Sequence, residues 1–463
     1  MITSFQSRFS QRPINTHQPL YGRSPVHPPN NSAGSRESRI LSCPFLLIAA
    51  SVVQLTLSAA AADWTEFRGP DGQGHSQATQ LPLTWSETEN IAWKVAIPGV
   101  GWSSPVVAED RIYLTTAIPV DADDDSKARH SLQVLCLKAD DGAVVWQKEV
   151  FEHGADEKIE MHEKNSHASP TPILDGDDLF VHFGPHGTAC LKTDGTIVWK
   201  NQNLTYAPQH GNGGSPALAD GVLVICCDGK DQRFVVGLDR STGQQIWRTG
   251  RELDPSRGFS FCTPTITETN GHLQAICPGS GGVWSYDVKT GEQLWRVAYG
   301  EGYSVVPRPV LGHGLVYVCS GFGDQQLFAI DPTGSGDITD SGVRWKIKKS
   351  VPKSPSILLV GNDIYMVDDA GIASCVDALT GELHWQQRLN GKYSASPSYA
   401  DGKIWFQDEN GTTVVVEPGH EYQEVARNTL GDGKSRTFAS FAFLDHAILL
   451  RSETHLYRIQ KAE

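Results

Sequence analysis

The sequence predicts an all-β fold, an eight-bladed β-propeller of four-stranded blades, from recurring features of its 463 residues. Each repeat opens with a small residue and Pro before an apolar run, as in Ser215-Pro216. Each repeat closes with a turn of the form Asp-x-x-Thr-Gly followed by Trp, as in residues 287–295. The closing tryptophans recur every 40 to 53 residues, and a period of this size with several short strands is typical of propeller blades.

Seven complete units follow one another along the chain, and each predicts four short strands. The units open at Ser104-Pro105, Ser169-Pro170, Ser215-Pro216, Thr263-Pro264, Arg308-Pro309, Ser354-Pro355 and Ser396-Pro397. In the third unit we expect strands over residues 215–219, 221–226, 234–239 and 245–248. The turn before the last of these strands contains Gly243, which supplies the positive φ that such a turn needs.

A tryptophan on the outermost strand of each unit is expected to dock against the neighbouring blade. A buried indole removes about 200 Å² of surface from water, which is enough to fix one blade on the next. The predicted docking residues are Trp93, Trp146, Trp199, Trp247, Trp295, Trp345 and Trp385.

The ends of the chain predict how the ring closes. After the seventh unit only three strands remain, over residues 438–444, 447–451 and 455–459. Residues 90–96, with Trp93, have the pattern of an outermost strand, so we expect this N-terminal strand to complete the eighth blade and remove the open edge. Insertions interrupt the regular pattern at residues 121–129, 152–164 and 334–342.

Three regions are expected along the chain: an N-terminal extension with a secretory signal at residues 1–62, a lead-in segment packing on the propeller at 63–89, and the propeller at 90–463. Arg36 and Arg39 precede an apolar stretch over residues 40–57 and a run of small residues, the pattern of a secretory signal. We therefore expect an exported protein, periplasmic or extracellular, that does not span the membrane after cleavage. An uncleaved membrane anchor is the alternative, because about 18 apolar residues can cross a bilayer.

Charge, cysteine and histidine content limit the function classes. A formal charge of −14 argues against a nucleic-acid partner, which requires a basic face. The cysteines recur at fixed positions of the repeat, as small buried residues do, and no pair has zinc-ligand spacing. His153, His162, His167, His186 and His210 cluster in the sequence together with His182. Since His182 lies inside a strand, no metal site is predicted.

The Asp-x-x-Thr-Gly-x-x-x-Trp turn, clearest at residues 287–295 and 377–385, resembles the repeat of the PQQ-binding-like, or quinoprotein-dehydrogenase-like, β-propeller family. The resemblance covers residues 90–460 and is nearest to exported BamB-like bacterial propellers, which implies a scaffold without a cofactor. Enzymes of the wider family hold PQQ over a central Trp beside Ca²⁺ bound by carboxylate and amide oxygens, with an Asp as base. Many add a vicinal disulfide, and this chain offers Cys226-Cys227 followed by Asp228.

The expected function is a non-catalytic, exported scaffold that binds an envelope protein or a glycan as a monomer, with no catalytic residue and no cofactor. Residues just before each innermost strand should line one mouth of the channel. The predicted ligand-binding residues are Trp102, Asn165, His167, His210, Asn212, Arg308, Lys353 and Tyr393. The alternatives are a PQQ-dependent alcohol or sugar dehydrogenase, with Ca²⁺, and a BamB-like outer-membrane protein assembly factor.

Overall fold

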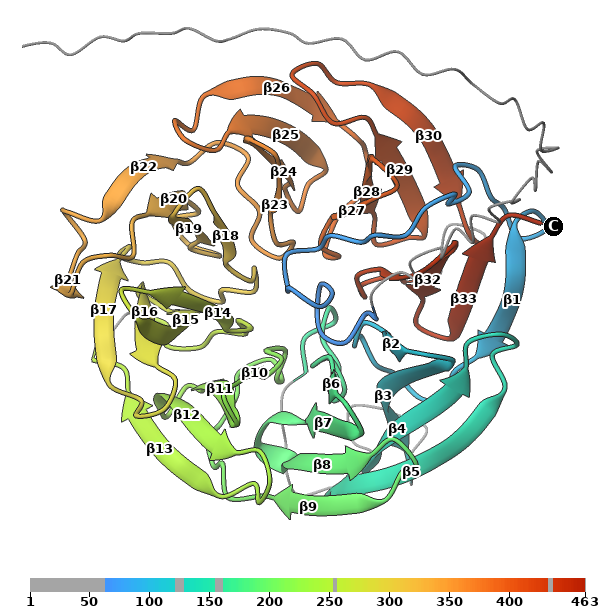
Figure 1. Ribbon diagram of the computed structural model, residues 1–463, viewed down its shortest axis with the longest axis horizontal. Helices are drawn as coiled ribbons and strands as arrows, with labels where there is room; N and C mark the ends of the chain where they lie inside the picture. Colours follow the sequence, from blue (N-terminus) through green and yellow to red (C-terminus); the bar gives the residue numbers. More distant parts are fainter. Residues whose placement is uncertain (1–62, 121–128, 155–160, 253–255, 432–435, 463) are drawn as a thin grey trace, which may run out of the picture. The chain divides into compact units, whose positions relative to one another are not determined.

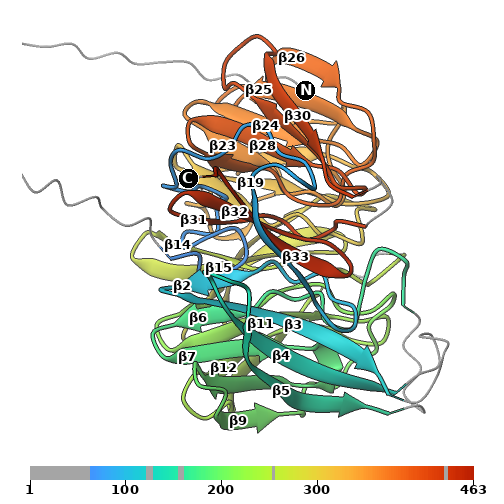
Figure 2. The same cartoon turned by 90° about the vertical axis from the view of Figure 1, so that its right-hand side faces the viewer.

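The computed structural model describes residues 63–120, 129–154, 161–252, 256–431 and 436–462, which form eight four-stranded antiparallel blades arranged in a ring (Figure 1). The predicted fold class is confirmed. Figure 2 shows the ring from the side, where β2, β3, β4 and β5 of the first blade, within residues 106–153, lie one below another. The expected secretory signal lies outside the described residues. Within those ranges, no helix is long and apolar enough to cross a membrane.

In each blade the strands follow one another from the innermost, beside the channel, to the outermost, at the rim. The first four blades contain β2 (Val106–Ala108), β3 (Arg111–Pro119), β4 (His130–Lys138) and β5 (Val144–His153); β6 (Ile173–Asp175), β7 (Asp178–His182), β8 (Thr188–Lys192) and β9 (Ile197–Asn201); β10 (Ala217–Ala219), β11 (Val222–Asp228), β12 (Arg233–Asp239) and β13 (Gln245–Gly250); and β14 (Thr265–Thr269), β15 (His272–Gly279), β16 (Gly282–Asp287) and β17 (Gln293–Ala298). A short 3₁₀ helix, η2 (Gly184–His186), joins β7 to β8.

The last four blades follow the same order. They contain β18 (Val310–Gly312), β19 (Leu315–Cys319), β20 (Leu327–Ile330) and β22 (Val343–Ile347); β23 (Leu358–Val360), β24 (Asp363–Val367), β25 (Ile372–Asp377) and β26 (Leu383–Arg388); β27 (Ser398–Ala400), β28 (Lys403–Gln407), β29 (Thr412–Val416) and β30 (Glu424–Thr429); and β31 (Ala442–Leu444), β32 (Ala447–Arg451), β33 (His455–Gln460) and β1 (Ile91–Ala96). The predicted ring closure is confirmed, because β1 pairs antiparallel with β33.

In the third, fourth and sixth blades, an Asp and a Gly fix the turn before the outermost strand. In the third blade, one carboxylate oxygen of Asp239 accepts hydrogen bonds from the backbone N–H of Ser241 and from both the backbone N–H and the hydroxyl of Thr242. Gly243 follows at φ +69°, a left-handed conformation that favours glycine. The same bonds recur around Asp287 and Asp377. The repeat motif therefore encodes a rigid turn at the rim of the ring.

Six of the seven predicted docking tryptophans donate their indole N–H to a carbonyl oxygen in this turn of the next blade. The pairs are Trp93 to Ala139, Trp146 to Thr193, Trp199 to Arg240, Trp247 to Val288, Trp345 to Ala378 and Trp385 to Gly419. The turn glycine lies against the same indole. A Cβ on Gly291 would be 2.4 Å from the ring of Trp247, so glycine is required there for space as well as for its backbone conformation.

Trp295 differs from the other six because the insertion at residues 334–342 covers it. Within this insertion β21 (Gly336–Asp337) pairs in parallel with β17, as a fifth strand on the fourth blade. Ile338 packs against Trp295 in the same apolar cluster. The Trp295 indole N–H donates instead to Gln274 Oε1 within its own blade, at 3.0 Å. The fifth blade thus contributes one strand, β21, to the sheet of the fourth blade.

A ring of hydroxyl groups, here called the collar, surrounds the channel where the innermost strands begin. In six places a backbone N–H of one blade donates to a Ser or Thr hydroxyl of the next, at 2.9–3.0 Å. The pairs are Ser104 to Thr171, Thr171 to Ser215, Ser215 to Thr263, Arg308 to Ser356, Ser356 to Ser396 and Ser396 to Ser440.

The collar corrects two of the predicted unit openings. The residues equivalent to Ser104 are Thr171 and Ser356, not Ser169 and Ser354, which lie two residues earlier. Residues 169–172 alternate small residues with Pro, and at residues 354–356 a Ser stands on each side of Pro355, so each unit offers a second small residue two positions away. Only the hydrogen bond across blades distinguishes them.

The segment at residues 63–89 crosses the centre of the ring (Figure 1). It bonds to the middle of innermost strands: Trp64 exchanges two backbone hydrogen bonds with Val107 on β2, at 2.7 and 2.8 Å. Farther along, Tyr399 on β27 donates its N–H to the carbonyl of Gly74 and accepts from the N–H of Ser76. The segment therefore spans the channel along the innermost strands, beside the collar.

Arg308 fastens the middle of this segment. Its guanidinium donates to the carbonyl oxygens of Phe67, at 2.6 Å, and Pro264, at 3.1 Å, and lies 3.1 Å from a carboxylate oxygen of Glu66. Burial raises the pKa of Glu66, an effect that the charge of Arg308 partly offsets. A second buried arginine, Arg68, donates to the carbonyl oxygens of Gln73 and Ile357.

Candidate functional site

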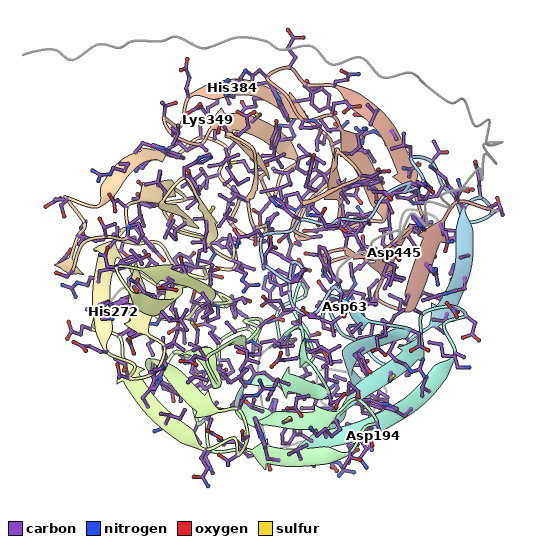
Figure 3. All side chains as sticks on the ribbon, viewed as in Figure 1. Asp63, Asp194, His272, Lys349, His384 and Asp445 are labelled. Carbon is purple, nitrogen blue, oxygen red and sulfur yellow. The ribbon has the colours of Figure 1, made fainter. Side chains whose placement is uncertain are left out.

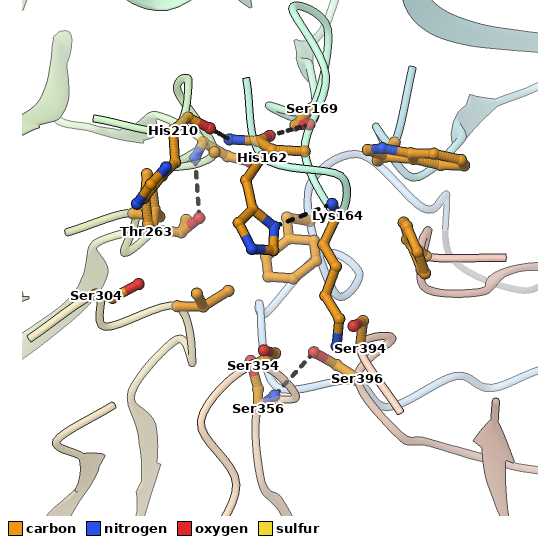
Figure 4. A pocket seen from close by; sticks show the side chains of 18 of the residues that line it. His162, Lys164, Ser169, His210, Thr263, Ser304, Ser354, Ser356, Ser394 and Ser396 are labelled. Atoms are coloured by element: carbon orange, nitrogen blue, oxygen red, sulfur yellow. Dashed lines mark hydrogen bonds between the residues drawn. The ribbon is translucent and has the colours of Figure 1, made fainter. Parts of the chain in front are cut away.

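The centre of the ring holds a pocket of about 330 Å³ that extends from the lead-in segment to the loops before the innermost strands (Figure 4). Its aromatic lining consists of Phe67, Trp102, Phe259, Phe261, Tyr303, Phe322 and Phe438. Its polar lining consists of the collar residues Thr171, Ser215, Thr263, Ser356, Ser396 and Ser440, with Ser169, Ser304, Ser354, Ser394, His162, Lys164, Asn165, His210 and Arg257. Phe67 comes from the lead-in segment, which closes the pocket at that end.

Aromatic rings face the pocket from opposite sides. Trp102 packs against Phe438 with ring centroids 4.7 Å apart. On the other side, Phe259 contacts Phe261 at 5.9 Å and Tyr303 at 5.7 Å. Rings held by one another in this way keep fixed faces toward the cavity, as a planar or sugar-like ligand requires.

The connection between the first two blades brings polar groups to the pocket. Asn165 donates to the carbonyl of His210 at 2.8 Å, and its side-chain oxygen accepts from the Ser169 hydroxyl at 2.6 Å. Lys164 extends across the cavity toward Ser394 and pairs with Glu409 at 2.6 Å (Figure 4). These bonds fix the loop, and the amide of Asn165 is committed to holding it.

The carboxylates of this region are engaged outside the pocket. Glu409 accepts from both Lys164 and the Ser394 hydroxyl, each at 2.6 Å. Among the described residues that line the pocket, none is Asp or Glu, while Lys164, Arg257 and two histidines are present. The lining is therefore neutral to basic, although the whole chain is acidic.

This donor set does not fit PQQ with Ca²⁺. Calcium takes oxygen ligands and prefers carboxylates, which the described lining does not supply. Trp102 offers an aromatic face, but a group that could act as a carboxylate base is missing from the same lining.

Cys226 and Cys227 also lie apart from the pocket. They are adjacent on β11, and their side chains pack in different apolar clusters, between different pairs of blades. Both are unpaired thiols, and burial raises the pKa of Cys227. Asp228 pairs with Arg251 at 3.0 Å, and both side chains are only 1% exposed. Cys227 thus belongs to the packing of the second blade on the third, and Cys226 to the packing of the third blade on the fourth.

The structure places the eight predicted ligand-binding residues in three settings. Trp102, Asn165 and His210 line the pocket. Lys353 lies beside it, with Nζ 5.1 Å from the ring of Phe322. The other four take part in contacts elsewhere: His167 with other histidines, Asn212 with the Tyr206 hydroxyl at 2.8 Å, Arg308 with the lead-in segment, and Tyr393 in a buried apolar cluster.

Several lining residues were not predicted, and their positions explain why. Phe322 lies in the loop between β19 and β20, which reaches the same mouth as the segments before the innermost strands because strands alternate in direction. Phe67 comes from the lead-in segment. Phe259 and Tyr303 precede innermost strands by several residues. Phe322 becomes predictable when the loop between the second and third strands of each blade is counted as part of this mouth.

The comparisons with known proteins agree on the propeller class. The family model described as outer membrane protein assembly factor BamB matches residues 130–377 and 337–423, more than half of the chain. Over 162 residues the chain is 29% identical to methanol dehydrogenase (cytochrome c) subunit 1 of Methylorubrum extorquens, covering 30% of this chain and 24% of that protein. It is 24% identical over 221 residues to the outer membrane protein assembly factor BamB of Yersinia pestis, covering 42% and 52%. These alignments thus span a quarter to a half of the relatives' length.

Solved structures show the same fold. BamB from Moraxella catarrhalis aligns with a TM-score of 0.55 at 14% identity, covering 80% of this chain and 99% of that one. The quinohemoprotein alcohol dehydrogenase from Comamonas testosteroni aligns with a TM-score of 0.60 at 12% identity, covering 87% and 81%. At these identities the likeness concerns the fold alone.

Proposed function

Because the chain belongs to the family of PQQ-like propellers whose model is described as outer membrane protein assembly factor BamB, we propose that it is an exported, non-catalytic scaffold whose central pocket binds a glycan. The composition of the pocket carries this proposal. Aromatic faces pack on the apolar faces of sugar rings, and hydroxyls, amides and basic side chains bond their oxygens. The described lining offers these groups and lacks the carboxylates that a PQQ-dependent oxidoreductase would use for calcium.

A titration with soluble envelope glycans tests the proposal. Muropeptides and neutral oligosaccharides would be titrated into the full chain while tryptophan fluorescence is followed, because Trp102 lines the pocket. Saturable binding is expected, and Phe261→Ala or Phe322→Ala should weaken it about fivefold to tenfold, since each removes one aromatic face. Leu383→Ala is the matched control, because Leu383 is 47% exposed on β26, an outermost strand.

A parallel arm separates the scaffold from the enzyme. The chain would be incubated with PQQ and Ca²⁺ and assayed for alcohol- or sugar-dependent dye reduction. Turnover that Phe261→Ala abolishes would overturn the scaffold proposal. Glycan binding without turnover would support it, and the absence of both would contradict the glycan as the ligand.

A second candidate function is an assembly factor that captures strands of outer-membrane proteins. Exposed apolar side chains and an added strand at the outer rim favour it. Val145, Val198 and Ile246 are 43–48% exposed on the outermost strands of three consecutive blades. The fourth outermost strand, β17, already accepts an added strand, β21. An extended amphipathic peptide could add to the other edges in a similar way.

Capture of such a peptide can be distinguished from pocket binding. Val198→Lys with Ile246→Lys should abolish cross-linking to a peptide of alternating apolar and polar residues, because the charges oppose edge pairing. The same double variant should leave glycan binding intact. Loss of peptide cross-linking in Phe261→Ala, and not in the double lysine variant, would contradict strand addition.

A further inference from the structure

Four histidines gather where the first blade meets the second, beside the pocket and outside its lining. The ring centroids of His130 and His167 are 4.4 Å apart, and those of His153 and His167 are 4.8 Å apart. His186 packs on the edge of His153 at 4.4 Å. His130, His153 and His186 are 1%, 5% and 7% exposed, and His167 is half-buried.

The fold assembles this cluster from four separate positions in the sequence. His130 begins β4 and His153 ends β5, and the antiparallel pairing of these strands sets the two residues directly opposite each other. His167 comes from the connection to the second blade, and His186 ends η2. The rigid hairpin of the first blade thus carries two imidazoles, and elements that follow it bring the others against them.

Three of the imidazoles place nitrogen atoms at the spacing that a metal centre needs. One ring nitrogen from each of His130, His153 and His167 lies within 4.8 Å of the other two. Around a tetrahedral ion with metal–nitrogen bonds of about 2.0–2.1 Å, ligand nitrogens are roughly 3.3 Å apart. Small rotations of the three side chains therefore suffice to converge on one ion.

We propose that His130, His153 and His167 bind a single first-row transition metal ion, with Zn²⁺ as the best match. Neutral imidazole suits zinc, copper and nickel, and the cluster offers nitrogen donors in place of the oxygen donors that calcium and magnesium prefer. The site lies on the boundary between two blades. A bound ion therefore links the hairpin β4–β5 to the connection that carries His167, and it stabilises the first blade against the second.

A metal titration of the full chain tests this site. The chain would be stripped with a chelator and titrated with Zn²⁺ by calorimetry and with Co²⁺ by absorption spectroscopy. We expect one ion per chain, a Co²⁺ d–d spectrum of tetrahedral intensity, and a rise in melting temperature on addition of Zn²⁺, because an ion that binds the folded state stabilises it. Both the Co²⁺ spectrum and the melting shift are measured on the unmodified chain, so they do not depend on whether a variant folds.

Substitutions then assign the ion to these residues. His153→Gln should weaken Zn²⁺ binding at least about tenfold and abolish the melting shift, while the metal-free variant keeps the circular dichroism of the unmodified chain. The matched control is the double variant His384→Gln and His420→Gln. Those two imidazoles stack at 3.9 Å and approach Asp363, and His384 lies at the outer rim (Figure 3).

The control variant should bind Zn²⁺ as the unmodified chain does. Loss of binding in the control together with full binding in His153→Gln would move the ion to Asp363 and overturn the proposal. Binding with no defined stoichiometry, or none at micromolar Zn²⁺, would overturn it as well. A glycan titration that is unaffected by His153→Gln is expected, because the pocket and the histidine cluster are lined by different residues.

Discussion

The indole N–H of Trp93 donates to the carbonyl oxygen of Ala139 at 2.9 Å, and this bond joins the last blade to the first. Trp93 lies on β1, which completes the eighth blade, and Ala139 lies in the outer turn of the first blade. The ring of Trp93 also rests against Gly142 in that turn. The closing junction therefore uses the same contact as the junctions between blades that follow one another in the sequence.

Replacing Trp93 should separate the two contributions of this contact. Trp93→Phe removes the N–H and should cost about 1 kcal/mol of unfolding free energy, whereas Trp93→Ala empties a large aromatic site and should cost about 3–5 kcal/mol. Chemical denaturation followed by circular dichroism measures both. Equal losses for the two variants would show that apolar packing contributes little to the closure.

Gly291 should tolerate no Cβ, for two separable reasons. It has φ +71°, and a Cβ would lie 2.4 Å from the ring of Trp247. Gly291→Ala should therefore cost about 1–2 kcal/mol for the left-handed backbone and a further 1–3 kcal/mol for the clash. Gly271→Ala is the control, since Gly271 has φ +77° and open space around it. Melting curves that fall equally for both variants would contradict the steric part.

Arg308 should hold the lead-in segment without taking part in ligand binding itself. Arg308→Ala removes its bonds to Phe67 and Glu66, so the segment should open locally. Hydrogen exchange at the backbone amides of Trp64 and Gly74 is expected to accelerate. Arg344→Ala, which breaks an exposed ion pair with Asp331, should leave these amides protected. Unchanged exchange in Arg308→Ala would place the anchor of the segment elsewhere.

The buried His182 should make the fold sensitive to acid. Burial lowers the pKa of His182 to about 3, from an ordinary value near 6.5. Below pH 6.5 the unfolded chain takes up a proton that the folded chain refuses until about pH 3. Stability should therefore fall by about 1.4 kcal/mol for each pH unit in this window.

Replacing the imidazole should flatten that dependence. His182→Gln has no proton to take up, so the unfolding free energy should change less between pH 6 and pH 4 than in the unmodified chain. His313→Gln provides the control at an exposed position. Denaturation curves at several pH values measure the slopes, and parallel slopes for His182→Gln and the unmodified chain would refute the assignment.

The sequence predicted the ring because the motif that builds each blade is local. Asp377, Thr380 and Gly381 fold one turn by bonds within five residues, and Trp385 follows at a fixed distance. Such patterns can be read without knowing which residues meet in space. The closure by residues 91–96 followed from counting strands, because a blade with an open edge is unfavourable.

The pocket and the histidine cluster depend on contacts between distant residues, and such contacts could not be predicted from local patterns. His130 opposes His153 only because β4 and β5 pair in one particular register. Arg308 stands at a position that should face the channel, yet it bonds to Phe67, far earlier in the chain. Trp295 has the docking pattern, but an insertion of the following blade covers it.

The pairing of β1 with β33 also fixes the order in which the molecule can be completed. β1 is the first strand of the ring to be synthesised, and its partner β33 is the last. Until β33 exists, β1 has no partner and the eighth blade contains only the pair β31–β32. The ring therefore closes only after nearly the whole chain has been made, as a late step whose loop-closure entropy spans the entire propeller.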